Sequence, residues 1–137
     1  MEPITVQATV NAPIEIVWQM WTLPEHITQW NFASPDWHCP AATNDPRTGG
    51  KFSATMAAKD GSFSFEFAGV YDKVIDHKLI TYSLGDGRKV IITFASDDDD
   101  QTTVTETFDP ETQNPIEMQR DGWQAIMDNF KKYVEEN

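Results

Sequence analysis

The chain has 137 residues, the length of one domain, and its five Trp, eight Phe and three Tyr can fill a core without a disulfide or a structural metal. Lys and Arg number 10 and Asp and Glu number 22, so the formal charge at pH 7 is −12. That charge argues against a nucleic-acid partner and against anionic membrane surfaces, because clustered Lys and Arg bind both.

We expect a soluble, cytoplasmic protein that does not insert into a membrane. Residues 1–10 contain no basic segment followed by an apolar one, so no targeting signal is predicted. No later segment approaches the roughly 18 consecutive apolar residues of a membrane-spanning helix. Cys39 is the only cysteine and cannot form an intramolecular disulfide, which fits a reducing compartment.

The first predicted elements are a strand and two short helices. Residues 4–10 alternate apolar and polar side chains, the pattern of a half-buried strand. Pro13 and Pro24 are residues that favour helix starts. The two helices turn apolar faces to the core, formed by Ile14, Val17, Trp18 and Trp21 in the first and by Ile27 and Trp30 in the second.

Residues 31–48 show no periodicity and are predicted to form one long loop. Each of the three X-Pro pairs in this range biases its first residue away from a helix. Long loops in compact domains are often lids or binding loops, and this one carries Phe32, Trp37 and His38. The alternative is that the two aromatic residues only anchor the loop to the core.

Five strands and a long helix complete the chain. The strands are predicted at residues 51–59, 62–74, 78–84, 89–96 and 101–109, with turn residues such as Asp60-Gly61 between them. Such short connections indicate an antiparallel meander. The final helix spans 114–137, begins with Asn114-Pro115 and carries an apolar stripe of Ile116, Trp123, Met127, Phe130 and Val134. The order β-α-α-β-β-β-β-β-α is an α+β arrangement, with helices on one face of an antiparallel sheet.

Strand alternation predicts which side chains face the interior. The inward set comprises Phe52, Ala54, Met56, Phe63, Phe65, Phe67, Val90, Ile92, Phe94, Val104 and Phe108. Glu106 falls on the same face, where an ionised, unpaired carboxylate costs several kcal/mol to bury. Glu106 is therefore either part of a polar cavity with a raised pKa, or a strand-edge residue that meets water or a Lys or Arg.

Small residues make a ligand cavity plausible, although a packed core would also use them. Ala54, Ala58, Ala68 and Gly69 leave room on the strands, and Gly122 interrupts the last helix at a cost of about 1 kcal/mol. No metal or other cofactor is predicted, because His38 and Cys39 are adjacent and the other histidines lie in separate elements.

Several segments, in this order, resemble the SRPBCC or START-like superfamily. They are TVNAPIEIVWQMWTLPEHITQWN, TGGKFSATM, FAGVYDKVIDHKLITYSL, TVTETFDPE and GWQAIMDNFKKYVE. Within that superfamily the chain is most similar to the bacterial stand-alone domains named for homology to the activator of the heat-shock-protein-ninety ATPase. The resemblance implies a helix-grip fold like that of the birch pollen allergen, with a curved antiparallel sheet around the long C-terminal helix.

The resemblance also implies a deep hydrophobic cavity. Members of the superfamily bind lipids, sterols, polyketides and other apolar or amphipathic molecules, and some catalyse cyclisation or dehydration. Carried over by position, with Trp37 of the long loop added, the expected cavity residues are Trp30, Phe32, Trp37, Phe52, Met56, Phe65, Phe67, Glu106, Trp123 and Met127.

Three functional hypotheses follow from these observations. The first is a protein that binds a small hydrophobic molecule in the cavity. The second is an enzyme of the cyclase or dehydratase type in which Glu106 is the general acid or base and His38 or Trp37 orients the substrate. The third is a chaperone-accessory or protein-interaction module. The charge of −12, and a length that leaves no room for the additional domain of the eukaryotic activators, argue against chaperone contact.

Overall fold

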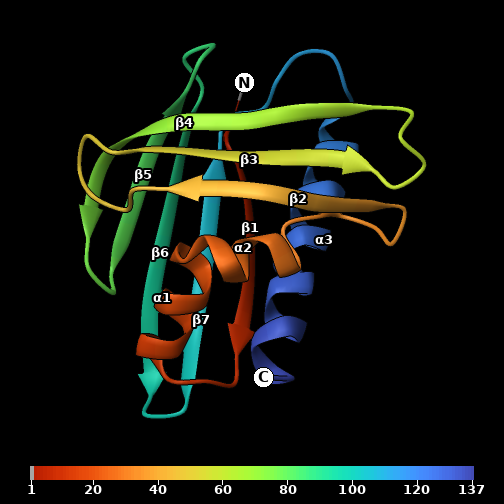
Figure 1. Ribbon diagram of the computed structural model, residues 1–137. Helices are drawn as coiled ribbons and strands as arrows, with labels where there is room; N and C mark the ends of the chain where they lie inside the picture. The colour runs from red at the N-terminus through yellow and green to blue at the C-terminus, as the bar shows by residue number, and fades with distance from the viewer. Residues whose placement is uncertain (1) are drawn as a thin grey trace.

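The computed structural model describes residues 2–137, in which the chain forms seven strands and three helices. Their order follows the sequence-based prediction, with one strand more (Figure 1). The elements are β1 (Ile4–Val10), α1 (Ile14–Thr22), α2 (Pro24–Trp30), β2 (Trp37–Asn44), β3 (Lys51–Ala58), β4 (Ser64–Ile75), β5 (Leu79–Leu84), β6 (Lys89–Asp98), β7 (Gln101–Phe108) and α3 (Ile116–Glu135). None of the helices in this range is both long and apolar enough to cross a bilayer.

The strands form one antiparallel sheet in the order β1-β7-β6-β5-β4-β3-β2. The sheet curls strongly, so that β2 and β3 run across the direction of β6 and β7 in Figure 1. A bulge in β4 between Tyr71 and Lys73 adds a residue where β4 pairs with β5, and bulges bend a strand and increase its twist. The sheet therefore has a concave face, and the buried side chains of its strands point into it.

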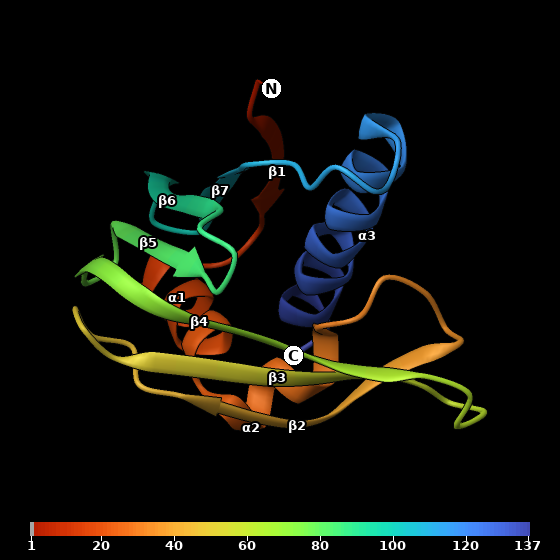
Figure 2. The same cartoon turned by 90° about the horizontal axis from the view of Figure 1, so that it is seen from above.

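Helix α3 lies along the open side of the curled sheet, next to β1 (Figure 2). It buries Met127, Phe130 and Val134 in the main hydrophobic core, each at most 2% exposed. Helices α1 and α2 pack against the C-terminal half of α3, where Trp21 and Trp30 both contact Phe130 edge-to-face at 4.8 Å between ring centroids. This arrangement confirms the helix-grip fold.

The prediction of one loop over residues 31–48 is wrong for residues 37–44, which form strand β2. This strand is at the edge of the sheet and pairs with β3 alone. Its register shifts between His38 and Ala41, and Pro40 lies in that irregular stretch. An edge strand tolerates a proline at a bulge, because no neighbouring strand needs the missing N–H group. The X-Pro pairs therefore marked a bulge and strand ends rather than a loop.

Two local predictions also differ from the structure. Phe63 is 58% exposed instead of facing the interior. It precedes the first residue of β4, in the turn after Gly61, and packs against Trp37 at 6.1 Å between centroids. At the other end of the chain, Pro115 is the N-cap residue of α3 and no side chain caps the helix, so the cap lies one residue later than predicted.

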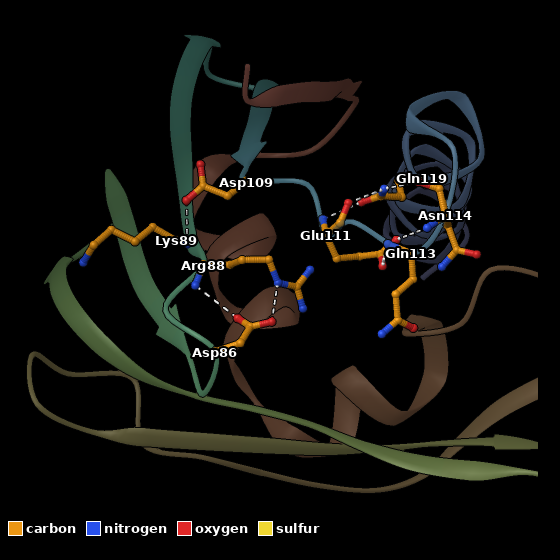
Figure 3. Close-up of polar contacts among 8 residues, drawn as sticks. All are labelled: Asp86, Arg88, Lys89, Asp109, Glu111, Gln113, Asn114 and Gln119. Carbon is orange, nitrogen blue, oxygen red and sulfur yellow. Dashed lines mark hydrogen bonds and ion pairs between the residues drawn. The ribbon is translucent and has the colours of Figure 1, made fainter. Parts of the chain in front are cut away.

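Polar side chains hold the connection between β7 and α3, as Figure 3 shows. Gln119 is 8% exposed and its side-chain amide donates hydrogen bonds to the carbonyls of Glu111 at 3.0 Å and Asn114 at 2.8 Å. Its side-chain oxygen accepts from the Glu111 N–H at 2.9 Å. In the β5–β6 turn, which Figure 3 also shows, Arg88 pairs with Asp86 at 2.7 Å. Gln119 thus fixes where the first turn of α3 begins.

Candidate functional site

A cavity of about 210 Å³ lies between the concave face of the sheet and the helices. All three helices and six of the seven strands contribute to its wall. The lining residues are Trp21, Ile27, Trp30, Asn31, Thr43, Asn44, Phe52, Ser53, Ala54, Met56, Phe65, Phe67, Tyr71, Ile80, Tyr82, Ile92, Glu106, Trp123 and Ile126. Phe65 is 44% exposed, so the cavity reaches the surface beside it.

Aromatic rings form much of the wall and hold one another in place. Phe52 contacts Tyr82 in an edge arrangement with centroids 4.6 Å apart, and Phe67 contacts Trp123 at 6.0 Å. Trp123 in turn stacks on Phe108, with centroids 3.8 Å apart and the planes 11° from parallel. These contacts join β3, β4, β5 and β7 to α3, so the shape of the cavity is determined by packed rings.

Glu106 is a buried acid in this apolar wall. The alternation of β7 turns it inward with Val104 and Phe108, and it is 7% exposed. Strand β7 lies between β1 and β6, so Glu106 is not at a sheet edge. Within residues 2–137 its carboxylate makes no hydrogen bond and no ion pair. Burial alone raises its pKa from 4.5 to about 8.

The cavity also contains two tyrosines. Tyr82 is 6% exposed, and its pKa is raised well above the usual value by burial and, secondarily, by the negative charge of Glu106. Tyr71 donates a hydrogen bond to Oδ1 of Asn44, whose side-chain amide donates to the Thr22 carbonyl at 2.6 Å. These two hydrogen bonds connect β4 and β2 to the end of α1. Tyr82 and Glu106 remain as the inner polar groups without a protein partner in the described range.

Most of the residues predicted for the cavity come together in it. They are Trp30, Phe52, Met56, Phe65, Phe67, Glu106 and Trp123. The structure places Phe32, Trp37 and Met127 outside the lining. Met127 is 1% exposed and belongs to the packed core, while Trp37 contacts Phe65 and Phe63 at the hairpin end of the sheet. Phe32 follows the end of α2 and is half-buried.

His38 also lies apart from the cavity. It pairs with Ala57 between β2 and β3 and is not among the lining residues. Neither His38 nor Trp37 is therefore placed to orient a molecule against Glu106.

Cys39, which follows His38, is buried, and burial raises the pKa of its thiol. Residues 2–137 contain no group of three His, Cys, Asp or Glu side chains that could hold a metal ion.

Sequence reasoning missed several lining residues. Tyr71 and Tyr82 have the same alternation as Phe67 and Ile80, so extending the inward pattern along their strands would have found them. Asn44 could not be found in this way, because it lies in the segment predicted as a loop. Trp21 was predicted to face the core, and the structure shows that the core has a cavity at this position.

Comparison with solved structures shows close relatives. The chain is 43% identical to an AHSA1-like protein from Aeromonas hydrophila, with a TM-score of 0.90 over 98% of this chain and 92% of that one. It is 56% identical to a protein of Cytophaga hutchinsonii, with a TM-score of 0.84 over 98% of this chain and 93% of that one. A protein of Nitrosomonas europaea, 19% identical, shares the fold with a TM-score of 0.84 over 98% of this chain and 95% of that one.

No curated protein matches the chain. The model of one protein family, described as "Activator of Hsp90 ATPase homolog 1-like protein", matches residues 11–135, which is nearly the whole chain. The matched range runs from the end of β1 to the last turn of α3 and so includes every element of the cavity. The chain therefore belongs to the Activator of Hsp90 ATPase homolog 1-like family.

Proposed function

We propose that this protein binds a small apolar or amphipathic molecule in the cavity between the curled sheet and α3. The observation that carries the proposal is a cavity lined mainly by aromatic and aliphatic side chains, with a single buried acid among them. Ligand sites have this composition, in which apolar surface supplies affinity and a few polar groups supply orientation.

The size of the cavity indicates which molecules it can enclose. A cavity of about 150 Å³ in another protein admits benzene, so about 210 Å³ has room for an aromatic ring with a short substituent. Among the lipid, sterol, polyketide and aromatic classes that the superfamily binds, this volume favours ring-sized aromatic molecules. A longer ligand would have to extend past Phe65 to the surface.

Any catalytic role of Glu106 would also depend on binding in this cavity. A carboxyl group with a pKa of about 8 can donate or accept a proton near neutral pH, which is what a general acid or base requires. Only the two tyrosines accompany it as titratable groups in the lining. A reaction at Glu106 would still need a substrate held in this cavity, so the binding proposal covers both cases.

The test is to fill the cavity without altering the outer surface. Ala54 is 4% exposed and lines the cavity, so Ala54→Leu places a larger side chain inside it. Ala68, on the neighbouring strand, is exposed, and Ala68→Leu is the matched control. Indole and 2-naphthol are titrated into the protein with labelled Ile methyl groups. We expect saturable shifts at Ile80, Ile92 and Ile126.

These shifts should be retained in Ala68→Leu and weakened about ten-fold or more in Ala54→Leu, because the added methyl groups occupy ligand space. Shifts that survive in Ala54→Leu, or that occur on exposed Ile16 and Ile91 instead, would show that the probes bind elsewhere and would contradict the proposal.

A further inference from the structure

The cavity contains a buried carboxyl group with no positive side chain in the described lining to pair with its ionised form. Glu106 is 7% exposed and no lining residue in the described range is Lys, Arg or His. Removing the partner of a buried charge usually costs several kcal/mol, so a buried acid is normally paired within the protein. Here the described lining contains no positive side chain, and Tyr82 is the lining residue whose pKa responds to the charge of Glu106.

The cavity that contains Glu106 is also lined by aromatic rings, whose faces attract positive charge. The face of an aromatic ring carries partial negative charge and attracts a cation within about 6 Å of the ring centre. Trp123, Tyr82 and Phe67 all line the cavity, and Trp123 is held in one orientation by its stack on Phe108. Trp and Tyr are among the rings that bind cations best.

We infer that the cavity selects an organic cation, in which a small apolar or aromatic body carries an ammonium group that pairs with the Glu106 carboxylate between the aromatic rings. This inference rests on the proposed function and names the ligand class of the same site. The bound cation supplies the partner that Glu106 lacks, and the apolar wall covers the rest of the ligand. On binding, the protonated carboxyl releases its proton to solvent.

The same arrangement rejects ligands with a carboxylate. Once Glu106 is ionised, a fatty acid or aromatic acid would place a second negative charge beside it, with no Lys, Arg or His in the lining to neutralise either. Like charges in a site of low dielectric repel strongly. A neutral carbonyl compound is the intermediate case, because it could accept a hydrogen bond only from the protonated form of Glu106 or from Tyr82.

Three probes of equal size test the inference. Benzyltrimethylammonium is a permanent cation, 4-phenyl-2-butanone is a neutral carbonyl compound and 3-phenylpropionate is an anion, and each has one phenyl ring and a short polar substituent. Their affinities are measured at pH 8 from the methyl shifts of Ile80, Ile92 and Ile126. We expect the cation to bind about ten-fold or more tightly than the ketone, and the anion to bind more weakly than both.

Two variants test whether the Glu106 carboxylate, and not negative charge elsewhere in the chain, gives the preference for the cation. Glu106→Gln keeps the shape and removes the charge, so it should lose the preference for the cation while still binding the ketone. Glu136→Gln removes the same charge from an exposed position at the end of α3 and should keep the preference. If Glu106 had a structural role alone, Glu106→Gln would weaken the binding of all three probes together and would keep the preference for the cation.

The pH dependence gives an independent result. Between pH 6 and pH 8 the affinity for the permanent cation should rise by more than about ten-fold, because Glu106 must ionise to pair with it. The other titratable groups of the lining are Tyr82 and Tyr71, whose pKa values are raised by burial, and both stay protonated in this range. Arg88, whose positive charge acts on Tyr82, lies outside the lining, pairs with Asp86 and stays charged. Affinity for the ketone should not rise.

Equal affinity for the cation and the ketone at pH 8, or a cation preference that survives in Glu106→Gln, would overturn the inference and leave the cavity as a ligand site. Failure of these three probes and of indole and 2-naphthol to shift the cavity methyl groups would instead overturn the proposed function, and the inference with it. The two failures are therefore distinguishable in one set of titrations.

Discussion

At the scale of single residues, burying Glu106 costs stability, and the same residue is the one proposed to select the ligand. Its position on β7 forces the side chain inward, and the neighbouring side chains offer it neither a hydrogen bond nor a positive charge within the described residues. A pKa of about 8 means that the folded protein holds a proton at neutral pH that the unfolded chain has released. The pH dependence of stability and the proposed selection of a cation therefore depend on the same group.

This linkage predicts that stability falls as pH rises. The unfolded carboxyl titrates near 4.5 and the folded one near 8, so between these values the native state binds more protons than the unfolded state. The contribution is lost progressively as the pH rises from 4.5 through 8, and it stops changing once Glu106 is fully ionised in the folded protein. Relative to Glu106→Gln, the protein should lose on the order of 4 kcal/mol of unfolding free energy across this range.

Urea unfolding at pH 5, 6.5 and 8.5 measures this difference. The two proteins should have similar stability at pH 5, and the Gln variant should be the more stable one at pH 8.5. Glu136→Gln, which removes an exposed carboxylate, should follow the unmodified protein at every pH. Parallel pH profiles for the protein and Glu106→Gln would mean that water in the cavity solvates the carboxylate fully.

At the scale of elements, the position of a strand in the sheet decides how well its sequence pattern predicts it. The central strands β5, β6 and β7 alternate regularly and were predicted within one or two residues of their observed ends. Strand β2 was missed because an edge strand is partly exposed on both faces and tolerates Pro40. Its contribution to the cavity, through Thr43 and Asn44, was missed for the same reason.

Helix α3 contains a glycine that the structure does not require. A Cβ atom built at Gly122 meets nothing within 4 Å, and Gly122 does not line the cavity. Because Ala favours the helix by about 1 kcal/mol over Gly, Gly122→Ala should raise the unfolding free energy by about that amount. Thermal and urea unfolding measure the gain, and probe binding should be unchanged.

Gly69 on β4 provides the contrast. A Cβ atom there would lie 2.7 Å from the Ser83 carbonyl oxygen and 2.9 Å from a ring carbon of Phe52. Gly69→Ala should therefore destabilise the protein by about 1–3 kcal/mol and displace Phe52, which lines the cavity. A stabilised Gly69→Ala together with a destabilised Gly122→Ala would contradict both assignments.

At the scale of the whole molecule, the net charge of −12 acts as self-repulsion in the compact state. Ion pairs such as Arg47–Asp45 at 2.8 Å lie at the surface, where they contribute little. Potassium chloride shortens the Debye length from about 30 Å at 0.01 M to about 10 Å at 0.1 M. Over this range at pH 7, the unfolding free energy should rise by on the order of 1 kcal/mol.

The control for this prediction is the same measurement near pH 4.5, where many carboxyl groups are protonated and the repulsion is smaller. There the effect of salt should largely disappear. A loss of stability with added salt at pH 7 would show instead that the surface ion pairs outweigh the repulsion.

The amino-acid sequence by itself determined the order of the elements other than β2, the inward faces of the central strands and the face of α3 that is buried. These features follow from periodicity, which depends only on near neighbours in the chain. The placement of Glu106 on an inward face was also predictable in this way.

Only the tertiary structure decided which inward residues surround empty space. Met127 and Trp123 lie on the same helical stripe, yet Met127 is packed in the core and Trp123 lines the cavity. The difference depends on how far the sheet curls around α3, and that curl comes from twist and the β4 bulge acting between strands distant in the sequence. Local patterns carry no information about such distances, so the cavity and the isolation of Glu106 within it emerged only from the fold.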